Sequence, residues 1–518
     1  MSEKEQQIGT SRETALRKRF YFVIIAAIAV ALAYMAFTYE RQSREEFEVS
    51  GKIRSIAALP LENLASDPDQ AFFVNGIHEA LITGLSKVSA LHVISWDSAR
   101  RYRNSGKAIP DIARELGVDA VVEGSVLIVG GMIRLSVRLF DGRTGRQLWS
   151  DNFNSELGNI LTIYALVTQE IVKQVGITLT PEEEAGFVVL RPVSQEVYEL
   201  YLKGRYMCDK WSPQELQLGI NLMQHAVNLD RLYAPSYAGL ARCLQYSAFF
   251  GYVLPQEVFL RARTTAAMAV LLDDNLAEAH VALAGILYYL DFDIDAAEKE
   301  LTRALELDPV YLPALVHMSW LLGETGRFDE ARTLTLRAIQ LDPLNTAIHQ
   351  AMGELYYLHG DFNSSISAFK KGLELDRNDA SLHQYLSWPH EQLGQYESAI
   401  ALNKSAVELS QRAPIYLSGL GYSYGVAGMR ENALQILEEL QQAKNPSSYD
   451  LALVHLGLGN LEQAVDLLEM AFDSKDSYLI YIIQDSKFDP LRENERFIKL
   501  LNQLKNPAQR PVRRQSSG

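Results

Sequence analysis

The chain has 518 residues and a formal net charge of −15, and 48% of its residues are hydrophobic. This length exceeds what one hydrophobic core usually serves, so we expect several domains or a repeat array. The acidic balance argues against a nucleic-acid-binding role for the whole chain, because phosphate recognition needs a concentrated basic face.

The beginning of the chain has the pattern of a membrane anchor. Residues 20–39 carry no charge, and an Arg-Lys-Arg triplet at positions 17–19 stands directly before them. A helix of this length rises about 30 Å, which matches the hydrocarbon core of a bilayer. Because basic flanks stay in the cytoplasm, we expect a cytoplasmic tail over residues 1–19, a transmembrane helix over 20–39, a linker over 40–52 and all later residues outside the cytoplasm.

Two features of this span leave alternatives open. Ala31, Leu32 and Ala33 resemble a small-x-small cleavage site, so a cleaved signal peptide competes with an uncleaved anchor. We favour the anchor because the apolar run continues past that site. Ala27 and Ala31 have the small-xxx-small spacing of helix dimers, which leaves a homodimer possible.

Residues 53–185 alternate short strands with amphipathic helices, which indicates a small α/β domain. Gly130 and Gly131 join two strands as a hairpin, and Asp141 and Gly142 begin the turn into a third. We expect strands over residues 55–59, 92–95, 120–128, 132–139 and 147–154, and helices over 70–85, 109–116 and 160–179.

Three stretches of this domain carry a resemblance to a known module. They are SIAALPLENLASDPDQAFFVNGIHEALITGLSKVSALHVIS, IPDIARELGVDAVVEGSV and RLSVRLFDGRTGRQLWSDNFN. Their pattern looks like the amino-terminal domain of TolB and its FlgO-like relatives. The resemblance implies a module that bacteria often couple to helical repeats in adenylate cyclases, serine/threonine kinases and winged-helix regulators. Because the 19 residues before the span are too few for such an output domain, we expect this chain to lack one.

From residue 196 the chain repeats with a period of 34. The marks are Gly326, Gly360, Gly394 and Gly428, followed five positions later by the small residues Ala331, Ser365, Ala399 and Ala433. This pattern resembles the tetratricopeptide repeat family, in which each unit is a pair of antiparallel helices. We expect about seven units over residues 196–477, capping helices over 478–505 and a disordered tail over 506–518.

The resemblance also implies a concave groove lined by fixed positions of each unit. In this chain those positions are Tyr289, Trp320, Glu324, Gln350, Glu354, Tyr357, Gln384, Trp388, Glu391 and Tyr422. Rings bury apolar side chains of an extended peptide, amides bond its backbone, and carboxylates favour Lys or Arg in it. Interhelical packing is the alternative, because aromatic residues at helical spacing often belong to a core.

The two cysteines of the chain, Cys208 and Cys243, both lie near the first repeats. Two cysteines cannot form a disulfide framework or a cysteine metal site. We expect two free, buried thiols, with pairing between neighbouring repeats as the alternative in an oxidising compartment.

We find no spacing that predicts catalysis, and we expect no cofactor and no metal. The chain has neither a Gly-x-x-x-x-Gly-Lys loop nor a His-Glu-x-x-His pair. His349 and His383 hold equivalent positions in successive units, but no cysteine or carboxylate cluster accompanies them, which favours a surface or interhelical role.

The expected fold class is therefore α plus α/β: one transmembrane helix, a TolB-like α/β domain and an all-α solenoid. The favoured function is a non-catalytic scaffold in a bacterial inner membrane, with the N-terminus cytoplasmic and the bulk periplasmic, that binds protein or peptide partners but no nucleic acid. The first alternative is a sensory subunit that signals through its span to a separate cytoplasmic enzyme or regulator. An enzyme is the second.

Overall fold

The computed structural model describes residues 53–64, 71–156, 160–186, 193–210, 212–443 and 446–505. The predicted cytoplasmic tail, transmembrane helix, linker over 40–52 and C-terminal tail over 506–518 lie outside the described residues. Among the helices that are described, none is both long enough and apolar enough to cross a membrane.

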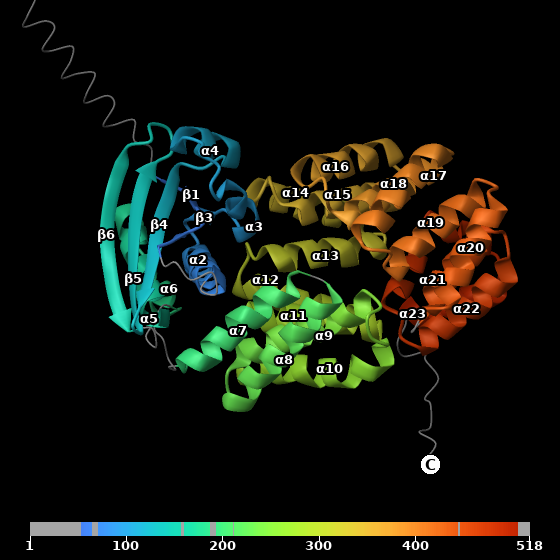
Figure 1. The fold of residues 1–518 in the computed structure, drawn as a ribbon, viewed down its shortest axis with the longest axis horizontal. Coiled ribbons are helices and arrows are strands. Elements are labelled where there is room, and N and C mark those ends of the chain that lie inside the picture. The colour runs from blue at the N-terminus through green and yellow to red at the C-terminus, as the bar shows by residue number, and fades with distance from the viewer. Residues whose placement is uncertain are drawn as a thin grey trace, which may run out of the picture. The chain divides into compact units, whose positions relative to one another are not determined.

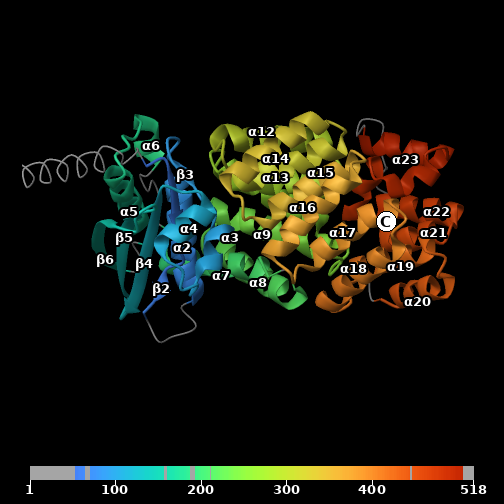
Figure 2. The same ribbon diagram turned by 90° about the horizontal axis from the view of Figure 1, so that it is seen from above.

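One six-stranded sheet forms the frame of the first domain (Figures 1 and 2). Its strands are β1 (Ser55–Ala58), β2 (Glu62–Asn63), β3 (His92–Val93), β4 (Ala120–Val129), β5 (Met132–Asp141) and β6 (Gln147–Glu156). The order is β3-β1-β4-β5-β6, and β2 pairs with β4 beside that path. The strands β1 and β4 are parallel, whereas β4, β5 and β6 are antiparallel, as the predicted hairpin at Gly130 and Gly131 requires.

Helices complete this domain. They are α2 (Ala71–Ser86), α3 (Trp96–Ala99), α4 (Ile109–Leu116), α5 (Ile160–Gln174) and α6 (Pro181–Gly186). The prediction for α4 is confirmed, and Gly117 ends that helix in the left-handed region. The helix predicted over 160–179 stops earlier, because Gly176 has a φ of 78°. The short elements β2 and α3 were not predicted, since two to four residues show no periodicity.

Eight helix pairs follow among the described residues, running from green to red in Figure 1. They are α7 (Gln195–Cys208) with α8 (Pro213–Leu229), α9 (Ala234–Phe249) with α10 (Pro255–Leu272), α11 (Ala277–Ile286) with α12 (Ile294–Leu307), α13 (Leu312–Glu324) with α14 (Phe328–Leu341), α15 (Thr346–Leu358) with α16 (Phe362–Leu375), α17 (Ala380–Gln392) with α18 (Tyr396–Leu409), α19 (Pro414–Val426) with α20 (Arg430–Gln441), and α21 (Ser448–Gly457) with α22 (Leu461–Asp473). This is the helical repeat that the period of 34 predicts.

The in-phase glycines stand at the turn between the two helices of a pair. Gly326, Gly360, Gly394 and Gly428 have φ values of 80°, 83°, 69° and 76°, which is the left-handed region. A residue without a Cβ adopts this conformation at little cost. The recurrence of glycine every 34 residues is therefore a requirement of the turn.

Gly360→Ala is expected to lower the free energy of unfolding by about 1 kcal/mol. No atom lies within 4 Å of the position of a new Cβ, so the cost comes from the left-handed backbone and not from a clash. Urea unfolding of the two proteins measures the difference. An unchanged midpoint would show that the turn relaxes to another conformation.

The third pair departs from the pattern. A π-helical turn (Leu287–Asp291) extends α11, and Phe292 occupies the glycine position with a φ of 55°. Its ring is buried and stacks on Phe472 of α22, with the ring centroids 6.0 Å apart. The last pair thus contacts the third pair, and the aromatic contact holds an otherwise unfavourable backbone.

Between α22 and residue 505 the structure describes no further helix pair. The chain continues as two 3₁₀ helices, η5 (Ser477–Ile483) and η6 (Ser486–Leu491), followed by α23 (Glu495–Lys505). We call residues 477–491 the groove segment. Capping helices were predicted here, but only α23 is an α-helix.

Cys208 and Cys243 form a disulfide, so the expectation of free thiols is wrong. Cys208 ends α7 and Cys243 lies in α9, the first helices of neighbouring pairs. Their separation of 35 residues is close to one repeat, which places the two side chains at nearly equivalent positions in adjacent units. The Cα atoms are 5.6 Å apart, within the range that a disulfide needs.

Buried polar contacts join the α/β domain to the array. The hydroxyls of Ser95 and Ser98 donate to the carboxylate of Asp342, which ends α14 and is fully buried. His92 Nε2 donates to the carbonyl of Leu341 at 2.7 Å, and Arg101 Nη1 donates to a carbonyl at the end of α16 at 2.7 Å. Leu341 and Asp342, at the end of the fourth pair, therefore bind β3 and α3 of the α/β domain.

The groove of the repeat array

The ten predicted groove residues lie on successive first helices of the pairs. Trp320, Glu354, Trp388 and Tyr422 form one row, spaced by 34 residues on α13, α15, α17 and α19. Tyr357 and Glu391 form a second row, and Gln350 and Gln384 form a third. Tyr289 lies in the π-helical turn, and Glu324 ends α13.

These residues do not line an open groove in the structure. Eight of them are buried: Tyr289, Glu324, Glu354, Tyr357, Gln384, Trp388, Glu391 and Tyr422. Trp320 and Gln350 are partly exposed. Part of the burial is the interhelical packing named as the alternative, because the ring of Tyr357 in α15 lies 5.4 Å, centroid to centroid, from that of Trp388 in α17. The rest comes from the groove segment.

The groove segment packs against the aromatic residues of the array. The ring of Tyr481 lies 5.9 Å from that of Trp388, and the ring of Tyr478 lies 4.5 Å from that of Phe249 in α9. Leu479, Ile480 and Ile482 are fully buried. A stretch outside the repeats therefore fills the surface on which a ligand was expected.

Lys487 is the polar centre of this contact. Its Nζ lies 3.9 Å from the ring centroid of Trp388 and 4.9 Å from that of Tyr357, which is cation–π geometry. Nζ also lies 3.3 Å from Tyr357 Oη and 3.3 Å from Asp485 Oδ2. Tyr357 Oη donates in turn to Asp485 Oδ1 at 2.6 Å. Two rings and one carboxylate thus surround a single ammonium group.

The buried carboxyl groups have perturbed pKa values. Burial raises the pKa of Glu354 to about 8, although a hydrogen bond from Gln350 Nε2 at 2.7 Å opposes the shift. Burial raises the pKa of Glu391 to about 7, opposed by the charge of Lys487 and by the hydroxyl of Ser423. Burial also raises the pKa of Glu324 well above its usual value. These groups favour the proton-bearing form unless a cation approaches.

The raised values predict that stability falls as the pH rises from about 4.5 to about 8. Glu354 and Glu391 hold protons in the folded state that the unfolded state releases near pH 4.5, so their contribution is complete below that pH and is lost as the pH rises through about 7 and 8. Burial lowers the pKa of His78 and of His317 to about 4. Those histidines destabilise the fold only below about pH 6.5, so above that pH they do not contribute to the change in stability.

Glu354→Gln is expected to make this alkaline loss smaller, because glutamine has no proton to release. The measurement is the free energy of unfolding in urea at about pH 6.5 and about pH 8.5 for both proteins. The wild type should lose more stability over this interval than the variant. Equal losses would mean that Glu354 is already ionised in the folded state.

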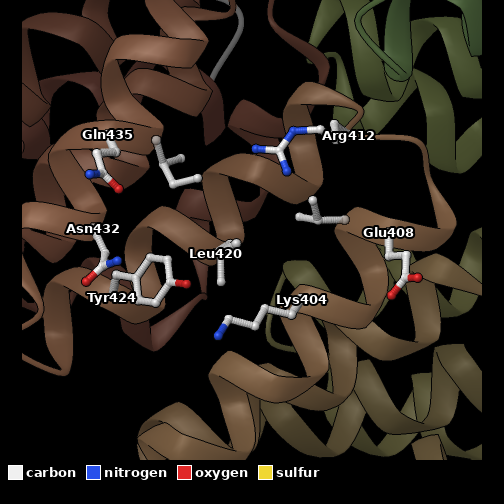
Figure 3. A pocket seen from close by; sticks show the side chains of 9 residues that line it. Lys404, Glu408, Arg412, Leu420, Tyr424, Asn432 and Gln435 are labelled. Atoms are coloured by element: carbon white, nitrogen blue, oxygen red, sulfur yellow. The ribbon is translucent and has the colours of Figure 1, made fainter.

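A separate pocket of about 510 Å³ lies between α18, α19 and α20 (Figure 3). Val407, Leu420 and Ile436 line it, with Lys404 and Tyr424 beside them. Leu420 and Tyr424 lie on the opposite face of α19 from Tyr422, so this pocket is not part of the groove. Sequence analysis did not predict it, since its residues follow no motif.

Two local patterns have structural roles. The Gly-x-Ser-x-Gly sequence at residues 421–425 lies inside α19, where Ser423 is fully buried and donates to Glu391 Oε1, so it does not form the exposed strand-to-helix elbow of a hydrolase. His349 and His383 each direct Nε2 to the carbonyl six residues earlier, at 2.8 Å and 3.0 Å. Both histidines therefore fasten the turn before their own helix.

Comparison with known proteins identifies the repeats and some relatives. Residues 288–355 and 346–379 match models of the tetratricopeptide repeat family. The protein named "Putative adenylate cyclase 3" from Rhizobium meliloti is 34% identical over 187 residues, which are 36% of this chain and 32% of the relative. The transcriptional regulator HilA of Salmonella typhimurium is 25% identical over 132 residues, 26% of this chain and 24% of the relative. The chain therefore spans a third or less of the length of these relatives.

Among solved structures, pilF of Pseudomonas aeruginosa is 21% identical, with a TM-score of 0.32 over 43% of this chain and 96% of that chain. A tetratricopeptide repeat protein from Parabacteroides merdae is 14% identical, with a TM-score of 0.38 over 51% of this chain and 100% of that chain. The repeat models cover the middle of the helical array, including the glycine turns at Gly326 and Gly360. The chain thus contains tetratricopeptide repeats.

Proposed function

We propose that this protein is a non-catalytic, membrane-anchored adaptor whose tetratricopeptide array binds a protein partner. The observation that carries the proposal is that the groove already binds a peptide segment. The aromatic, amide and carboxyl side chains of the repeats contact the groove segment, which belongs to no repeat. Solenoids of this kind commonly bind through their concave surface. The groove residues named from the sequence remain our candidates for the partner site.

The location of this adaptor is also a proposal. We propose that residues 20–39 anchor the chain in a bacterial inner membrane and that the TolB-like domain and the array lie in the periplasm. The disulfide between Cys208 and Cys243 supports this location, because disulfides persist in oxidising compartments and are rare in the cytosol. Reporter fusions at position 50 and at the C-terminus test it, and a cytoplasmic signal at either would contradict it.

A second candidate is a sensory subunit that acts on a separate cytoplasmic enzyme or regulator. Its support is that the matched relatives are named as an adenylate cyclase and a transcriptional regulator. Replacing residues 20–39 by an unrelated membrane span distinguishes the two candidates. A sensory subunit loses its signal in this exchange, whereas an adaptor still captures its partner.

The adaptor function is tested by site-specific photo-crosslinking in cells. A photoreactive residue replaces Gln350, which is partly exposed at the groove, and the matched control replaces Arg337, which is exposed on α14. We expect a crosslinked partner from position 350 and none from position 337. Equal products from both positions, or none from position 350, would contradict the proposal.

A further inference from the structure

The groove segment resembles a bound ligand more than a conventional end cap. Its polar residues are oriented by side chains of the repeats: Asp485 accepts from Tyr357, and Lys487 lies between Tyr357 and Trp388. Lys487 is 4% exposed and Asp485 is 2% exposed. A segment that only caps the solenoid needs apolar contacts alone. The specific binding site for the ammonium group of Lys487 therefore requires another explanation.

The groove also holds more acceptors than the segment satisfies. Glu391 Oε2 and Glu324 Oε2 are buried and have no hydrogen-bond partner among the described residues. A cavity of about 10 Å³ lies beside Glu324, between Trp320 and Tyr481. A buried acceptor without a donor is costly, so a ligand with further cationic donors would be held more firmly than the present occupant.

The segment begins at a left-handed residue that contacts other units of the array. Lys475, between α22 and η5, has a φ of 57°, a conformation that side-chain-bearing residues rarely adopt. Its Nζ lies 3.2 Å from the carbonyl of Leu290, 3.3 Å from Asp291 Oδ1 and 4.2 Å from the ring centroid of Phe259. Contacts to the second and third pairs thus hold the start of the segment in place.

We propose that the groove segment is an intramolecular occupant of the partner site, and that the partner displaces it with a lysine that follows an acidic residue by two positions and precedes an aromatic one. This proposal rests on the adaptor function proposed above. The chemistry of the partner is that of Asp485, Lys487 and Phe488. The tethered segment competes at an effective concentration on the order of millimolar, so the site is closed until the segment is released or a stronger ligand arrives.

The test uses the full chain and a labelled nine-residue peptide with the sequence of residues 484–492, followed by fluorescence anisotropy. The variant Asp485→Asn/Lys487→Met removes the charged pair of the segment and keeps its size. We expect this variant to bind the free peptide at least about tenfold more tightly than the wild type does, because a larger fraction of its sites is open. Adding Trp388→Ala or Glu391→Gln to that variant should abolish the gain.

A peptide with norleucine in place of the lysine is the matched control, and it should bind neither protein. Circular dichroism and thermal unfolding establish that every variant is folded. Equal weak binding by the wild type and the folded double variant would overturn the proposal, and so would equal binding of the norleucine peptide. Because the probe is synthetic, these outcomes do not depend on whether the crosslinking experiment finds a partner.

Discussion

Lys487→Met is expected to lower the free energy of unfolding by about 3 to 5 kcal/mol, the range for removing one partner of a buried ion pair. Methionine preserves most of the volume between Trp388 and Tyr357 but leaves the carboxylate of Asp485 buried without its cation. Urea unfolding followed by tryptophan fluorescence measures the loss, since Trp388 itself reports on this site.

The control for this prediction is the double variant Asp485→Asn/Lys487→Met. Removing both charges eliminates the uncompensated carboxylate, so part of the lost stability should return. The segment still lacks the contacts of its ammonium group with Trp388 and Tyr357, and it stays less firmly held than in the wild type. The single change Asp485→Asn should cost less than Lys487→Met, because an asparagine at this position can still accept from Tyr357 Oη. A loss below about 1 kcal/mol for Lys487→Met would mean that water reaches Asp485 and that the segment is not firmly seated.

The helix pairs could be predicted from the sequence because their signals are local. Gly360 favours a left-handed turn whatever the rest of the fold is. Glycine and the small residue after it return at the same spacing in each unit, so the turn recurs. The hairpin between β4 and β5 was equally predictable, because Gly130 and Gly131 both have positive φ values. Such features depend on neighbouring residues alone.

The state of the groove could not be predicted, because it depends on residues far apart in the chain. Tyr357 and Asp485 are separated by 128 positions, and no pattern in either region specifies the other. The available signal was the run from Tyr478 to Ile483, which is apolar without helical periodicity and follows the last unit. An apolar run of this kind must be buried against another surface of the protein. The rows of aromatic and carboxyl residues on the first helices were the surface to which the sequence assigned no partner.

The disulfide illustrates the same limit at shorter range. A spacing of 35 residues placed the two cysteines in adjacent units, which made pairing a real alternative. Whether the two cysteines pair depends on the direction of each side chain, which the spacing does not give. Composition favoured two free thiols, because two cysteines in a long chain are usually unpaired. Residues 208 and 243 face each other only once α7 and α9 have packed.

Replacing both Cys208 and Cys243 by serine is expected to cost about 3 to 4 kcal/mol, the chain-entropy value for closing a loop of this length. The bond joins α7 to α9, so it acts on the first unit of the array. The first unit also packs on α2 of the α/β domain through α7, so loss of the bond should loosen α8 and the contact between α7 and α9 before the later units open. Limited proteolysis should then cut near these helices first, while the later units stay protected. A reductant should have the same effect on the wild type and none on the double variant, and a wild type that is insensitive to the reductant would contradict the bond's stabilising role.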